Sequence, residues 1–163
     1  MYSQIDSNKR NSIILMMLFI ILIIGIGYGL EFIWGDGSFT FVWGAVILSI
    51  LMTSFSYFQG DKIALTSTGA KPIEKNDNPY LYRMVENLCI TAGTPTPKIY
   101  IIEDETINAF ATGRKPELAS IAVTRGAIKK LANEELEGVL AHELSHIKNY
   151  DIRFMTLVAV LVG

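Results

Sequence analysis

Cysteine is nearly absent from this sequence, and an excess of positive charge is absent altogether. The chain has 163 residues and a single cysteine, Cys89, so a disulfide framework is excluded. Its 14 Lys and Arg residues are outnumbered by 16 Asp and Glu, which excludes a strongly basic nucleic-acid-binding protein. Hydrophobic residues make up 50% of the chain, which excludes an acidic disordered protein. No glycine-rich phosphate-binding loop is present, so nothing predicts a nucleotide partner.

Charge is also scarce in the first 60 residues, which hold five of the 30 charged residues and two long uncharged runs. One run extends from Ser12 to Leu30 and the other from Gly37 to Gly60. Each is close to the roughly 20 residues that a helix needs to cross a bilayer. We predict a transmembrane hairpin over residues 1–60, with spans at about 12–30 and 38–58. The first apolar stretch exceeds the roughly 7 to 15 residues of a signal peptide, which favours a retained anchor.

The basic residues that flank the two runs predict their orientation. Lys9 and Arg10 precede the first run, the connector has neither Lys nor Arg, and Lys62, Lys71 and Arg83 follow the second. Such residues are retained on the cytoplasmic side of a membrane. We therefore expect a multi-pass protein of the cell membrane, in contact with the lipid bilayer, whose polar part faces the cytoplasm.

The remaining residues predict a linker over 61–78 and a small domain over 79–153. Asn78 and Pro79 are typical of a helix start, and Gly93 of a helix end. The elements expected after that helix are short strands at 98–102, 109–112 and 120–124, a short helix at 126–131, and a long helix capped by Asn133. Helices that accompany a small sheet indicate an α+β domain.

The long predicted helix contains the only two histidines of the chain, in the motif His142-Glu143-Leu144-Ser145-His146. Residues four apart lie on one face of a helix, so both imidazoles can reach one zinc ion. The adjacent carboxylate can then approach a water molecule on that metal. The motif predicts one Zn²⁺ per chain, with His142 and His146 as metal ligands and Glu143 as the catalytic residue.

A solvated helix face that happens to carry two histidines is the alternative interpretation of this motif. On a helical wheel the apolar residues share one sector of roughly 80°. They are Leu136, Leu140, Leu144 and Ile147. The two histidines lie outside that sector, whereas Glu143 lies near its edge. A carboxylate beside an apolar core needs a polar partner, which favours the zinc site.

The motif and its surroundings resemble the HtpX-type membrane metalloprotease family. The resemblance is carried by residues 108–113 (NAFATG) and 140–151 (LAHELSHIKNYD), and it extends over essentially the whole chain. It implies a zincin-like fold and a zinc endopeptidase in the cell membrane. It also implies a role in quality control under stress, with damaged or misfolded membrane proteins as substrates. In that family the histidines bind zinc and the glutamate is the general base.

The resemblance further implies that Asn108 and Ala109 belong to an edge strand that aligns the substrate. Proteases commonly hold a peptide by adding it to a sheet edge through main-chain hydrogen bonds. From the residues alone, the segment is equally consistent with an interior strand. Asp151 is a weaker candidate, because on a regular continuation of the helix it would point away from His146.

Two histidines are one ligand short of the three that a catalytic zinc usually has. In the resembling family the third is a Glu on a later helix, so we expect the third ligand beyond Gly163. Residues 154–163 are uncharged and about half the length of a span, and they predict the start of a third. We therefore expect a C-terminally truncated chain that by itself binds zinc weakly and has little activity. The alternative is a non-catalytic, membrane-anchored binding or regulatory module. The in-chain alternatives for the third ligand are Glu103, Glu105, Glu134, Glu135 and Glu137. The last three lie on the same helix, mostly a turn or two before the histidines, and cannot complete a tetrahedron around the zinc.

Overall fold

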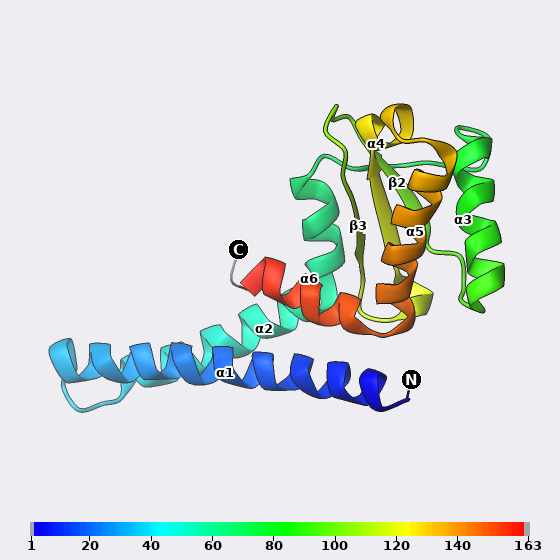
Figure 1. The fold of residues 1–163 in the computed structure, drawn as a ribbon. Coiled ribbons are helices and arrows are strands. Elements are labelled where there is room, and N and C mark those ends of the chain that lie inside the picture. Colours follow the sequence, from blue (N-terminus) through cyan, green and yellow to red (C-terminus); the bar gives the residue numbers. More distant parts are fainter. Residues whose placement is uncertain (1, 162–163) are drawn as a thin grey trace.

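The computed structural model describes residues 2–161, which form a long helical hairpin joined to a small α+β domain (Figure 1). The hairpin consists of α1 (Tyr2–Trp34) and α2 (Thr40–Ser67), which run side by side in opposite directions. Both helices are long and apolar enough to cross a membrane, over Ile5–Trp34 and Thr40–Ser67. Many of their large apolar side chains are exposed, as expected of helices in lipid. Two candidate spans therefore stand where the sequence predicts them.

The end of α2 differs from the predicted linker. The helix continues past Gly60 to Ser67, because Leu65 is buried against Ile102 and Ala122 on one face of the sheet. A two-residue strand, β1 (Lys71–Pro72), follows and pairs antiparallel with β2 (Lys98–Ile102). The anchor is thus joined to the domain by packing and by strand pairing, where the sequence predicted a polar linker.

The sheet has four strands in the order β1-β2-β4-β3. The predicted strands are confirmed: β2, β3 (Ala109–Thr112) and β4 (Ser120–Thr124) have the expected bounds. β2 and β4 are parallel, whereas β3 pairs antiparallel with β4, with Ala111 opposite Ile121. All five residues of β4 are buried. β3 therefore lies at one edge of the sheet.

Two helices, α3 (Pro79–Ala92) and α5 (Asn133–Lys148), cover the other face of the sheet (Figure 1). The predicted ends of α3 are confirmed, because Asn78 Oδ1 accepts a hydrogen bond from the Leu81 N–H and Gly93 ends the helix with φ 67°. The apolar stripe of α5 is confirmed as core. Its members Leu136, Leu140, Leu144 and Ile147 are at most 2% exposed.

The start of α5 differs by one residue from the prediction. Ala132 is the N-cap. Its backbone N–H donates to Glu135 Oε2 at 2.8 Å, so a side chain from the first turn of the helix accepts the hydrogen bond of this N–H. Asn133 is the first helical residue.

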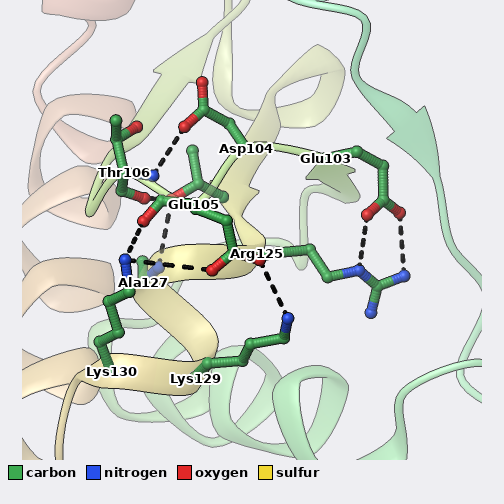
Figure 2. Close-up of polar contacts among 9 residues, drawn as sticks. Glu103, Asp104, Glu105, Thr106, Arg125, Ala127, Lys129 and Lys130 are labelled. Atoms are coloured by element: carbon green, nitrogen blue, oxygen red, sulfur yellow. Dashed lines mark hydrogen bonds and ion pairs between the residues drawn. The ribbon is translucent and has the colours of Figure 1, made fainter.

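The loop between β2 and β3 is fastened to the short helix α4 (Arg125–Lys130) by polar contacts (Figure 2). Arg125 donates two hydrogen bonds to Glu103, at 2.8 and 2.9 Å, and Lys129 donates to Glu105 at 3.0 Å. The Gly126 N–H donates to the Asp104 carbonyl at 2.9 Å. A Cβ at Gly126 would lie 2.2 Å from the Glu105 carbonyl oxygen, so only glycine fits this approach.

The last helix, α6 (Asp151–Leu161), packs against both α1 and α2 (Figure 1). Gly60 makes the approach to α2 possible, because a Cβ there would lie 2.9 Å from Thr156 Cγ2. Thr156 also joins α6 to the end of β3. Its Oγ1 is 2.9 Å from Thr112 Oγ1 and accepts a hydrogen bond from the Gly113 N–H at 3.3 Å. Helix α6 therefore connects the hairpin to the edge of the sheet.

Candidate metal centre

The two histidines of α5 face one another. His142 Nε2 and His146 Nε2 are 3.1 Å apart, and their rings are nearly perpendicular, at 86°. Two nitrogens bound to one tetrahedral zinc, at about 2.05 Å each, would lie about 3.3 Å apart. The pair therefore fits as two ligands of one zinc ion.

The structure does not bring a third ligand to this pair. Among residues 2–161 no group of three or more His, Cys, Asp or Glu side chains is arranged as a metal site. The carboxylates of Glu103 and Glu105, two of the candidates from the sequence, are paired with Arg125 and Lys129 (Figure 2). The hydrogen bonds from Arg125 lower the pKa of Glu103.

Glu143 lies between the helix and the edge strand. Its side chain is 9% exposed, and Oε2 accepts a hydrogen bond from the Ala111 N–H at 3.0 Å. The partner that a carboxylate beside an apolar core requires is thus a backbone group of β3. Because Oε2 is engaged, the orientation of the carboxyl group is held by the sheet.

The backbone of β3 alternates between its neighbour and its free edge. The Asn108 carbonyl accepts from the Thr124 N–H at 3.0 Å, so residue 108 faces β4. In an antiparallel pair the next residue faces the opposite way, which turns the N–H and C=O of Ala109 and Ala111 toward the free edge. Of the two residues that the resemblance assigns to substrate alignment, Ala109 presents its backbone to that edge, whereas Asn108 is tied to β4.

Asp151 lies against His146, contrary to the expectation from a regular helix. α5 ends at Lys148, Tyr150 adopts the left-handed conformation with φ 62°, and α6 begins at Asp151. This turn places Asp151 Oδ2 2.8 Å from His146 Nδ1. The nitrogen that faces His142 is the other one, Nε2. When a histidine binds a metal through one ring nitrogen, a carboxylate hydrogen-bonded to the other nitrogen orients the ring and raises its basicity.

The sequence holds a signal for this turn. Asn149 comes two residues after Ile147, the last residue of the apolar stripe, and asparagine is common where helices end. Asp151 opens a largely apolar helix, and an acidic residue is favoured in a first turn.

The first helix supports the same turn. Asn8 Nδ2 donates to the Asn149 carbonyl at 3.0 Å, and Lys9 Nζ lies 4.5 Å from the centre of the Tyr150 ring. The carbonyl is one of those that the end of α5 leaves without a helical partner. α1 thus contacts the segment that carries Asp151.

Residues 75–162 match Peptidase family M48. The match covers more than half of the chain and includes α3, the strands β2, β3 and β4, and the histidine pair. The chain belongs to peptidase family M48. A likeness to HtpX homologues extends over the whole chain, as the sequence motifs predicted. The protease HtpX homologue of Tropheryma whipplei strain Twist is 43% identical over 163 residues, which are 100% of this chain and 55% of that protein.

Two further HtpX homologues show the same relation. The HtpX homologue of Lactobacillus acidophilus is 39% identical over 100% of this chain and 55% of its own length. That of Dictyoglomus thermophilum is 41% identical over 99% of this chain and 53% of its own length. The chain therefore spans about half the length of the curated relatives that it matches.

A solved structure shares the fold. The crystal structure of S. mikatae Ste24p matches 99% of this chain and 37% of its own, with a TM-score of 0.53 and 20% identity. The arrangement of the long helical hairpin and the α+β domain is therefore a fold that a solved protein adopts.

Proposed function

We propose that this protein is part of a membrane-anchored zinc endopeptidase whose site is built on α5 and the edge of β3. The observation that carries the proposal is the arrangement of His142 and His146 beside a carboxylate that is hydrogen-bonded to a strand edge. Membership of peptidase family M48 supports the reaction class, peptide-bond hydrolysis. The third zinc ligand is expected beyond Gly163.

Zinc, when bound, would supply a Lewis acid that polarises the scissile carbonyl and lowers the pKa of water. His142 and His146 would hold it through their Nε2 atoms. Because Glu143 Oε2 accepts from the Ala111 N–H, Oε1 would be the atom that takes the proton of the attacking water. The same carboxyl group then gives this proton to the leaving amine, so Glu143 acts as base and afterwards as acid.

The substrate would bind as an added strand along β3. Ala109 directs its N–H and C=O to the free edge, and main-chain pairing there tolerates varied sequences. Such tolerance suits an enzyme of quality control, and damaged or misfolded membrane proteins are the proposed substrates. The basic residues that flank the hairpin support a site on the cytoplasmic side.

The test uses the protein together with its natural continuation, purified in detergent. Zinc per chain and casein cleavage are measured for the wild type, for Glu143→Gln, and for Glu137→Gln, an exposed glutamate on the same helix. We expect Glu143→Gln to keep its zinc and lose at least about 100-fold in rate. Glu137→Gln should cleave as the wild type does.

Equal cleavage by the wild type and Glu143→Gln would contradict the protease. A wild type that binds zinc and cleaves nothing would favour the non-catalytic binding module. Orientation is tested separately with a reporter fused after Gly69, at the end of α2. An extracytoplasmic reporter would contradict the proposed topology.

A further inference from the structure

We infer that an apolar groove beside β3 is the subsite that holds a large apolar side chain of the substrate. The groove has a volume of about 300 Å³ and lies between α2, β3 and α6. The inference rests on the proposed function, which it deepens by naming the kind of residue that the peptide must carry.

Three elements form the walls of this groove. Ile63 and Ser67 come from α2, Phe110 from β3, and Met155 and Ala159 from α6. None of the lining residues within the described range, 2–161, is charged. Burying an ionised side chain among such groups is costly, whereas an aliphatic or aromatic one gains from leaving water.

The strand geometry directs a substrate side chain into the groove. Side chains alternate between the two faces of a strand. Ala111 lies on the face that packs against α3 and α5, whereas Phe110 lies on the face that packs against α2. A peptide added to the free edge of β3 continues the sheet, so its side chains alternate in the same way. One set faces α5 with its histidine pair, and the other set faces α2 and α6, where the groove lies.

The catalytic carboxylate and the groove meet at the same residue of β3. The Ala111 N–H donates to Glu143 Oε2, and Ala111 also lines the groove. A peptide that reaches Glu143 along this edge therefore passes the mouth of the groove. Thr156 also lines the groove, and its Oγ1 is held by Thr112 Oγ1 and the Gly113 N–H.

The size of the groove favours the side chains of an extended peptide as its occupant. A volume of about 300 Å³ is at the small end of the range for ligand pockets, about 300 to 1,000 Å³. It suits one or two side chains of an extended peptide. A second copy of the protein, or a later part of the same chain, would cover the groove without reference to substrate sequence. The peptide is the occupant that the strand edge predicts.

The test measures kcat/KM for a series of peptides in which one residue near the cleaved bond is varied. The enzyme is the protein with its natural continuation, and the varied residues are Gly, Ala, Leu, Phe and Asp, scanned over neighbouring positions. At one position we expect Leu or Phe to exceed Gly by at least about tenfold, with Asp the poorest.

Variants of the groove give the matched comparison. Ser67→Trp, which places a large ring in the groove, should lower the Leu-to-Gly ratio at least about fivefold. Thr66→Trp is the control, because Thr66 is exposed on the same helix and does not line the groove. Ala159→Leu fills the opposite wall, from α6, and should lower the ratio in the same direction.

The outcomes separate the two proposals. Cleavage with no apolar preference, or with a preference that Ser67→Trp and Ala159→Leu both leave unchanged, would overturn the subsite; a groove covered by another part of the protein would give that result. If no peptide is cleaved, or if Glu143→Gln cleaves the peptides as fast as the wild type does, the result would instead contradict the protease itself.

Discussion

Asp151 Oδ2 lies 2.8 Å from His146 Nδ1, across the turn between α5 and α6. The two side chains are partly buried, at 24% exposure for His146 and 27% for Asp151. The second oxygen, Asp151 Oδ1, is buried and makes no hydrogen bond within the described residues. The contact holds the imidazole with Nε2 toward His142, so the proposed metal-binding geometry depends on a residue outside the His-Glu motif.

Replacement of Asp151 by Asn should weaken zinc binding. The amide keeps the size of the carboxylate and loses its charge, so the contact that orients the His146 ring is weakened. We expect the zinc affinity to drop by about 10- to 100-fold. Competition with a chromogenic chelator measures this in the protein with its natural continuation. Glu74→Gln, a loss of the same charge at an exposed site, is the control. An Asp151→Asn affinity equal to that of Glu74→Gln would show that the contact does not support the metal.

Glu143→Ala should be less stable than Glu143→Gln. The Gln carbonyl can still accept from the Ala111 N–H, whereas Ala leaves that N–H without its partner. An unsatisfied buried donor costs about 1 to 3 kcal/mol. Thermal unfolding in detergent, without added zinc, should therefore give a lower Tm for Glu143→Ala. Identical Tm values for the two variants would mean that the hydrogen bond contributes nothing to the fold.

Two glycine-to-alanine substitutions should change stability in opposite directions. At Gly126 a Cβ meets the backbone carbonyls of Glu105 and Thr106, so Gly126→Ala should destabilise by about 1 to 3 kcal/mol. At Gly138, inside α5, nothing lies within 4 Å of a Cβ, so Gly138→Ala should stabilise by about 0.5 to 1 kcal/mol. Unfolding midpoints in denaturant decide both. A stabilised Gly126→Ala would refute the close approach between α4 and the β2–β3 loop.

Removal of Arg125 should raise the pKa of Glu103. In the folded protein the Arg125 hydrogen bonds lower the pKa of Glu103. A lowered pKa in the folded state contributes stability above the unfolded-state value, about 4.3, and this is lost as the pH falls through the folded pKa. Both side chains are about half exposed, so the effect on stability is small. NMR titration of the Glu103 carboxyl group should show a higher pKa in Arg125→Ala than in the wild type. The control Arg83→Ala should leave the pKa of Glu103 unchanged.

Much of the fold could be predicted from local patterns. The bounds of β2, β3 and β4 and both ends of α3 are those expected, because strand runs, proline and glycine act over a few residues. The end of α2 and the strand β1 were missed. Leu65 is buried only because the sheet lies beside it, and the pairing of Lys71 with Ile101 joins segments 30 positions apart.

The sequence by itself determined the two apolar helices and the His142–His146 pair. Length in a bilayer and a spacing of four residues on a helix are local properties, and they need no knowledge of the rest of the chain. Only the tertiary structure decided that β3 is an edge strand, that Glu143 binds the Ala111 N–H, and that Asp151 reaches His146. The first two depend on which strands pair and which helix covers them. The third depends on one left-handed residue, Tyr150, whose conformation is held by Asn8 and Lys9 from the far end of the chain.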